Sequence, residues 1–100
     1  MLNIIERGIQ MGVNKKVKKG QKYFWYEYAV QKKENIYYVY EYEIAEENMD
    51  MEVCEYENVY KYLSLDDVIN NFPNKYGISF KEIHPLKGQR IFNVDLYIDD

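Results

Sequence analysis

Two apolar rows separated by a short polar break limit the fold of this chain more than any other feature of its sequence. Residues 23–31 alternate with a period of two, and residues 36–44 do the same. Successive side chains of a β-strand point to opposite faces, so such alternation predicts strands. The polar segment KKEN at residues 32–35 joins the two rows. Together they predict an antiparallel hairpin.

Aromatic rings lie on both faces of this predicted hairpin. The chain has 12 tyrosines, and alternation places Tyr37 and Tyr38, like Trp25 and Tyr26, on opposite sides. A tyrosine ring is apolar while its hydroxyl tolerates water, so these rings can be half-exposed or can form a rigid binding surface. One short helix is too small to cover even one face of a sheet. We therefore expect a protein interface on the tyrosine face and a homo-oligomer.

A change of period marks a helix in the second half of the chain. Ser64 and Asp67 have the spacing of an N-cap pair, in which the side chain accepts a hydrogen bond from a free amide of the first turn. Pro73 follows and ends the helix. Four apolar residues form one helical stripe, namely Leu65, Val68, Ile69 and Phe72.

The remaining elements have weaker patterns. A third strand is expected over residues 51–60, with a bulge at Val53 and Cys54 because both look inward. Residues 78–83 fit either a strand or a short capped turn, and residues 92–98 alternate as a half-buried strand. A short helix over residues 2–11 is a further expectation.

These elements predict an α+β fold with an antiparallel sheet of about five strands in the order β-β-β-α-β-β. One short helix packs on one face, and a second short helix lies at the N-terminus. The 100 residues form a single small domain. Within it, residues 1–21 are expected to be a basic N-terminal segment, and residues 22–100 to be the sheet and helix.

Charge is divided into blocks along the chain. Residues 1–33 contain eight Lys or Arg and two Glu, whereas residues 34–67 contain one Lys and eleven Asp or Glu. Residues 68–100 are balanced. The two opposite blocks either face different partners or pair with each other across a hairpin.

The basic block contains a candidate nucleic-acid arm. Five lysines precede and enter a run of aromatic residues, where they could neutralise phosphates while the rings stack on bases. The isoelectric point of about 5.0 argues against a dedicated nucleic-acid binder. We expect a basic loop that enters a core strand, with nucleic-acid binding as the alternative. The lysines are Lys15, Lys16, Lys18, Lys19 and Lys22.

The acidic block contains the candidate partner-binding residues. Oxygen-only clusters can hold Mg²⁺ or Ca²⁺, but the spacing of an EF-hand loop is missing from the sequence. A solvated acidic edge that prevents strand pairing is the simple alternative. We expect carboxylates and tyrosines of this block to contact a protein partner, and they are Glu41, Glu43, Glu46, Glu47, Asp50, Glu52, Tyr37, Tyr40 and Tyr42.

The inventory of catalytic side chains is small. His84 is the single histidine and Cys54 the single cysteine, so a Cys–His dyad is the one nucleophilic arrangement left. A cysteine in a core strand usually behaves as a small buried hydrophobe. Zinc sites need clusters of His and Cys. We expect a non-enzymatic protein without metal or cofactor.

Charge, size and composition together suggest a function class. High Lys, Asn, Ile and Tyr content with two alanines is typical of an AT-rich genome, such as that of a low-GC bacterium or its phage. A small acidic domain is suited to electrostatic docking on a basic nucleic-acid enzyme. In size and charge the chain is similar to immunity proteins and phage anti-defence proteins, including anti-CRISPR proteins. The alternative is a self-associating accessory protein without an inhibitory role.

The sequence also predicts where such a protein would act. Glu6 and Arg7 interrupt the N-terminal apolar residues, so neither a signal peptide nor a membrane span of about 20 apolar residues is expected. A single cysteine fits a reducing compartment. We expect a cytoplasmic location and no membrane partner.

Overall fold

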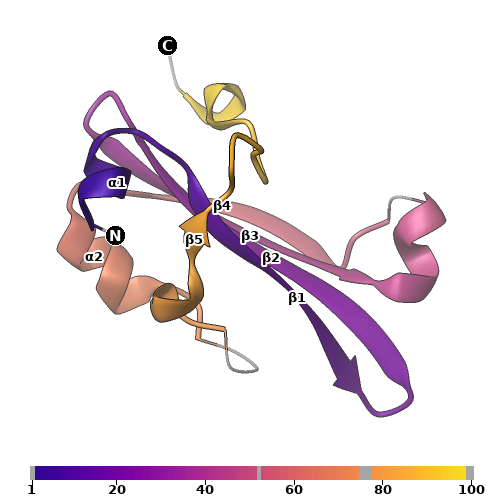
Figure 1. Ribbon diagram of the computed structural model, residues 1–100. Helices are drawn as coiled ribbons and strands as arrows, with labels where there is room; N and C mark the ends of the chain where they lie inside the picture. Colours follow the sequence, from indigo (N-terminus) through magenta and orange to yellow (C-terminus); the bar gives the residue numbers. More distant parts are fainter. Residues whose placement is uncertain (1, 52, 75–77, 99–100) are drawn as a thin grey trace.

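Five antiparallel strands form one sheet with the spatial order β4-β3-β2-β1-β5 (Figure 1). The computed structural model describes residues 2–51, 53–74 and 78–98. The expected α+β class is confirmed, as is a five-stranded antiparallel sheet with a short helix on one face. The elements are α1 (Leu2–Glu6), β1 (Met11–Lys19), β2 (Lys22–Lys33), β3 (Ile36–Ala45), the 3-10 helix η1 (Glu46–Met51), β4 (Tyr56–Tyr62), α2 (Leu65–Asn71), the 3-10 helix η2 (Phe80–Glu82), β5 (His84–Pro85) and the 3-10 helix η3 (Val94–Tyr97).

The hairpin predicted from the two alternating rows is the pair β2–β3. Val30 lies opposite Val39, and Lys33 lies opposite Ile36 at the end of the ladder. The turn residues Glu34 and Asn35 have φ values of +54° and +68°. Two consecutive residues with positive φ are typical of the two-residue turn whose twist matches that of the strands.

The N-terminal third contains a strand that was not predicted from the sequence: residues 11–19 of the expected basic segment 1–21 form β1. Within the described part of the chain, most residues of β1 have a strand neighbour on one side only, so the lysines of the segment VNKKVKK (residues 13–19) can stay in water as they would in a loop. β1 returns into β2 through a tight turn in which Gly20 has φ +67°, a conformation that favours glycine. The N-terminal helix is also shorter than residues 2–11 and ends at Glu6.

Two further expectations on strands are wrong. The chain does not enter a strand at residue 51: η1 and a connection come first, so Val53 is exposed and Cys54 lies before β4 instead of within it. Residues 92–98 contain η3 and pair with no strand among the described residues. The chain order is therefore β-β-β-β-α-β. Residues 80–82 form a 3-10 turn, which decides between the two alternatives for that segment.

Helices cover one face of the sheet, which we call the helical face. Ser64 accepts a hydrogen bond from the amide of Asp67 at 3.1 Å, as the N-cap spacing predicted. Val68 and Phe72 of the predicted stripe are buried there, and Ile69 is exposed. The buried cluster on this face draws on α1, α2, η2 and three strands, and consists of Ile5, Met11, Tyr26, Tyr28, Val30, Tyr37, Val39, Val68, Phe72, Ile78, Phe80 and Ile83.

The C-terminal segment covers the opposite face, which we call the C-terminal face (Figure 1). Phe92 and Val94 are buried against Ala29, Tyr38 and Tyr40. Phe92 and Val94, two residues apart, point toward the sheet because the segment lies across this face. Leu96, the next residue in the alternating pattern, does not point toward the sheet and is 75% exposed.

Small residues make room for this cover. A Cβ atom added to Gly12 would lie 2.6 Å from the Ile91 side chain and 2.8 Å from the Tyr28 carbonyl oxygen. Ala29, the cross-strand neighbour of Gly12, is fully buried. The close approach of the C-terminal segment therefore depends on the lack of side-chain volume at these two positions.

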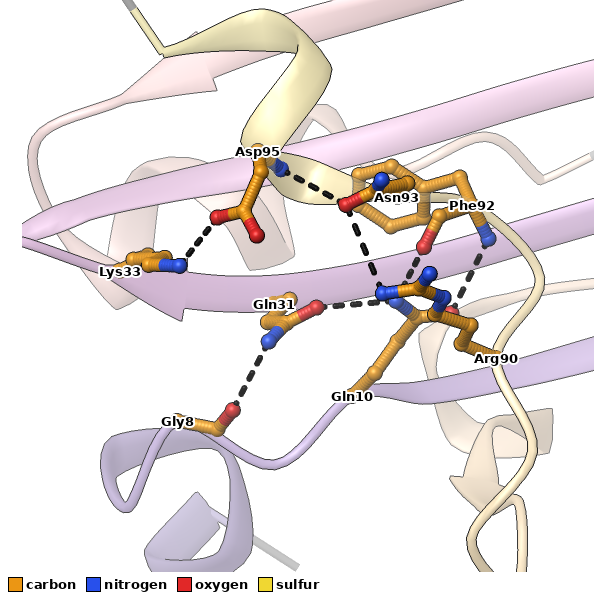
Figure 2. Close-up of polar contacts among 8 residues, drawn as sticks. All are labelled: Gly8, Gln10, Gln31, Lys33, Arg90, Phe92, Asn93 and Asp95. Carbon is orange, nitrogen blue, oxygen red and sulfur yellow. Dashed lines mark hydrogen bonds and ion pairs between the residues drawn. The ribbon is translucent and has the colours of Figure 1, made fainter.

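One buried glutamine fastens the C-terminal segment to the rest of the fold (Figure 2). Gln10 Oε1 accepts hydrogen bonds from the amides of Ile91 at 2.6 Å and Phe92 at 3.3 Å. Its Nε2 donates to the Phe92 carbonyl and to Gln31 Oε1, both at 2.9 Å. Gln31 in turn donates to the Gly8 carbonyl at 3.1 Å. The side chain of Gln10 thus satisfies backbone groups that would otherwise be buried without partners.

Replacing this glutamine should loosen the C-terminal cover. We expect Gln10→Leu to lower the free energy of unfolding by about 2–3 kcal/mol, because the amides of Ile91 and Phe92 lose their acceptor. Urea titration measures the loss, and amide exchange should accelerate most at residues 91–98. Arg90→Ala, an exposed change in the same segment, is the control. Equal stability of Gln10→Leu and wild type would contradict this role.

Candidate functional site

The C-terminal segment covers only part of its face, and the β1–β2 hairpin extends beyond it (Figure 1). On this uncovered part a hollow of about 320 Å³ opens between the strands and η1. We call it the Trp25 hollow, lined by Asn14, Trp25, Glu27, Tyr42, Ile44 and Met49.

Strand register places these side chains together. Glu27 in β2 lies opposite Asn14 in β1 and Tyr42 in β3, so three neighbouring strands contribute one row across the sheet. Trp25 and Ile44 form the next row. Trp25 and Glu27 are two positions apart in β2, as are Tyr42 and Ile44 in β3, so all four side chains point to the same face of the sheet. Met49 comes from η1 and closes one side.

An aromatic stack holds the Tyr42 wall in place. The ring of Tyr40 lies 6.2 Å from that of Tyr42 and 5.0 Å from that of Phe92, with interplanar angles of 13° and 6°. Tyr40 also donates a hydrogen bond to Glu57. Burial, followed by this hydrogen bond, raises the pKa of Tyr40, so its hydroxyl stays a neutral donor. The C-terminal segment is thereby connected through packed rings to the hollow.

Glu27 is the charged group of the Trp25 hollow. Asn14 Nδ2 donates to its Oε1 at 3.1 Å, and burial raises the pKa of the Glu27 carboxyl. Asn14 and Glu27 also line a second hollow of about 460 Å³, together with His84, Leu86, Gln89, Arg90 and Ile91. Glu27 therefore lies where the two hollows meet.

Aromatic walls around a carboxylate favour one class of guest. Guanidinium and ammonium groups are attracted to aromatic rings and form charge-assisted hydrogen bonds with carboxylates. A cation next to Glu27 would also relieve the cost of holding a partly desolvated negative charge. Ile44 and Met49 offer apolar surface for the aliphatic stem of an Arg or Lys side chain. The geometry thus suits a basic side chain.

The raised pKa of Glu27 gives a stability prediction. Below the unfolded-state pKa of about 4.3 both states hold the proton, so the carboxyl has no cost. As the pH rises through that value, the unfolded chain loses the proton first and the folded state is destabilised until its own raised pKa is passed. We expect Glu27→Gln to raise the melting temperature relative to wild type more at about pH 7 than at about pH 3.5.

Thermal unfolding at the two pH values measures this difference. Glu34→Gln is the matched control, because Glu34 is exposed in the β2–β3 turn. A Glu27→Gln effect of equal size at both pH values would show that desolvation of Glu27 is negligible.

The basic and acidic blocks pair with each other at the end of the sheet. Lys16 Nζ lies 3.2 Å from Glu46, Lys22 Nζ lies 3.1 Å from Glu47, and Lys19 Nζ lies 3.5 Å from Glu43. Of the two alternatives for the charge blocks, pairing across a hairpin is what these contacts show. The Lys16–Glu46 and Lys22–Glu47 pairs are exposed and contribute little to stability individually, whereas Glu43 of the third pair is buried. All three pairs reduce the field that either block presents.

Lysines of the expected nucleic-acid arm also form cation–π contacts with the aromatic rings of Tyr23 and Phe24. Lys16 Nζ lies 4.6 Å from the ring centroid of Tyr23, and Lys19 Nζ lies 4.2 Å from that of Phe24. Lys18 lies over Tyr23 as well, at 5.8 Å. Lys15 is exposed on the helical side of β1.

The expected partner-binding residues do not gather on one surface. Glu41 and Glu43 are buried on the helical face with Tyr37, and Glu41 accepts a hydrogen bond from Tyr60 at 3.1 Å. Tyr40 is buried under Phe92. Among these residues, Tyr42 lines the Trp25 hollow, while Glu46, Glu47 and Asp50 lie on η1 beside it. Glu52 lies outside the described residues.

Sequence reasoning missed Glu27 and the residues around it. One signal was present: Glu27 is an acid between Trp25 and Ala29 in a core strand of an otherwise basic block. The neighbours Asn14 and Met49 carried no such signal, because register and the path of η1 bring them in.

The candidate catalytic residues lie far apart. Cys54 precedes β4 and His84 lies in β5, at opposite edges of the sheet. At about 4.8 Å per strand, the two are separated by roughly 15 Å or more, too far for a Cys–His dyad. Among the residues that the structure describes, no group of three or more His, Cys, Asp or Glu side chains is arranged to hold a metal ion.

Comparisons with known proteins add no assignment. No protein-family model matches the chain, and no curated protein or solved structure shows significant similarity to it. Within residues 2–51, 53–74 and 78–98, every helix is too short or too polar to span a bilayer.

Proposed function

We propose that this protein is a non-enzymatic protein-binding module that docks on a basic partner through the Trp25 hollow and the neighbouring helix η1. The observation that carries the proposal is the position of Glu27, a partly desolvated carboxylate between Trp25 and Tyr42. In this role Glu27 receives an Arg or Lys side chain of the partner.

The rim of the hollow supports a protein partner over a small molecule. Met49 and Met51 are exposed on η1. Methionine side chains adapt to the shape of a binding partner, and exposed apolar patches commonly mark interaction sites. Asp50 of η1 is exposed and adds negative charge to this rim, which would steer a basic partner toward it.

Small acidic inhibitors of nucleic-acid-handling enzymes are the class that we propose, as in immunity proteins and phage anti-defence or anti-CRISPR proteins. Support comes from the 12.2 kDa size, the net charge of −4 and the complementarity of the hollow to basic side chains. A cytoplasmic location is part of this proposal and rests on the single cysteine. A self-associating accessory protein would have the same fold without using the hollow.

Trp25 is the single tryptophan of the chain, so its fluorescence reports directly on the hollow. We expect N-acetyl-arginine amide to change Trp25 emission with a dissociation constant in the millimolar range, as befits one side chain. The neutral isostere N-acetyl-citrulline amide should have little effect. Glu27→Gln should abolish the response to arginine, whereas Tyr42→Phe, which keeps the ring, should retain it.

Equal responses to arginine and citrulline, or full binding by Glu27→Gln, would contradict the proposed role of the hollow. Intact partners are tested with immobilised wild-type protein and Glu27→Gln as the matched control. A nuclease that binds the first and not the second should lose activity on binding. A nuclease that binds both equally, or that stays active when bound, would contradict the inhibitor proposal.

Nucleic-acid binding through the lysines is the competing function. It is weakened by the ion pairs of Lys16, Lys19 and Lys22 with the acidic block. We expect no measurable binding of single-stranded or duplex DNA at about 0.15 M salt, where the Debye length is near 8 Å. Fluorescence anisotropy measures this. A sub-micromolar affinity that is lost in Lys15→Gln/Lys18→Gln would establish the lysine arm instead.

A further inference from the structure

The sheet has two open edges with opposite properties. β5 pairs with Met11 and Gly12, so among the described residues no strand adjoins residues 13–19 of β1. Four of those seven residues are lysines, and two copies of this edge would repel each other. β4 is the other edge, and no described strand adjoins its outer side.

The β4 edge is complementary to itself. β4 has seven residues, YENVYKY, with Val59 at the centre. When two copies pair antiparallel about Val59, every residue of the strand gains a partner, and Glu57 of each copy lies opposite Lys61 of the other. Opposite charges at facing positions stabilise a sheet, whereas like charges destabilise it. The same register places Tyr56 opposite Tyr62.

Other registers lose this match. Paired residues must point to the same face of the extended sheet. The nearest allowed registers are therefore those centred on Asn58 or on Tyr60. A shift of the centre to Asn58 or Tyr60 leaves two strand residues of each copy outside the seven-residue overlap. It also removes Lys61 from its position opposite Glu57. Full overlap and charge pairing therefore select the same arrangement.

Apolar residues at both ends of β4 support a second copy as the occupant. Leu63 follows the strand and is 79% exposed, and Val53 precedes it and is 56% exposed. In the antiparallel arrangement the end of one copy lies beside the beginning of the other. Leu63 of each copy would then approach the connection that contains Val53 of the second copy, and both would be removed from water.

We propose that the protein forms a symmetric homodimer by antiparallel pairing of β4 with β4 of a second copy, which joins two sheets into one of ten strands. The twofold axis is perpendicular to the sheet and passes midway between the two Val59 residues. Such an axis keeps corresponding faces on the same side, so the two Trp25 hollows open on one surface. This interface includes none of the residues that line the Trp25 hollow. Its test measures the mass of the assembly and a cross-link, whereas the test of the proposed function measures arginine binding, so the two can fail separately.

A charge-swap series tests this dimer by sedimentation equilibrium at micromolar concentration. Wild type should have twice the 12.2 kDa mass of the chain. Glu57→Lys or Lys61→Glu alone places like charges opposite each other at two symmetric positions, and should weaken dimerisation about ten- to hundredfold. The double variant Glu57→Lys/Lys61→Glu should restore it. Glu82→Lys and Lys81→Glu, on η2, make the same charge changes away from this edge and should have no effect.

Cross-linking provides a second measurement that does not depend on charge. In the proposed register Val59 faces its own copy, and facing residues have Cα atoms about 4.5–5.5 Å apart, within the range of about 4.4–6.8 Å for disulfides. Val59→Cys in a Cys54→Ser background should therefore oxidise to a covalent dimer, whereas Leu63→Cys in that background should not.

Loss in both single variants with recovery in the double variant, or selective cross-linking at residue 59, supports the proposal. A wild-type monomer, or a dimer that both single substitutions leave intact and that residue 59 fails to cross-link, overturns it. A monomer would leave the β4 edge open to a strand from another protein.

Discussion

β2 and β3 carry large apolar side chains on both faces, and burial of both faces is the constraint on which the rest of the structure depends. Tyr26, Tyr28 and Val30 need a cover on the helical face, while Tyr38 and Tyr40 need one on the C-terminal face. In a chain of 100 residues, few residues outside the sheet are left to cover both of its faces. Two short helices serve one face, and an irregular C-terminal segment serves the other.

Polar contacts at the covered end make the C-terminal cover specific. Gln10 binds the backbone of residues 91–92, and the Lys33–Asp95 ion pair contacts η3. Gly12 and Ala29 allow the segment to approach the sheet closely. Because the cover stops short of the hairpin end, the apolar side chains of Trp25 and Ile44 stay accessible beside Glu27. The candidate site is thus a consequence of incomplete cover.

Charge has two different uses in this molecule. Three lysines of the basic block pair with three carboxylates of the acidic block at the end of the sheet, which limits non-specific attraction of nucleic acid. Glu27 instead lies on a face where burial opposes its charge. Under the proposed function, a cationic side chain of the partner would offset this cost. The lysines of β1 also oppose self-pairing of one sheet edge, whereas β4 carries charges of both signs, Glu57 and Lys61.

The β2–β3 hairpin, the capped helix α2 and the α+β class can be predicted from residues 23–72 alone, because they depend on local periodicity and on helix capping. Tertiary structure decided the rest. The lysines of β1 became a strand because β2 offered a free edge, and residues 92–98 crossed the C-terminal face because an exposed apolar surface lay there. The candidate site belongs to this second group: Asn14, Glu27, Tyr42 and Met49 are distant in sequence, and only strand register and the path of η1 bring them together.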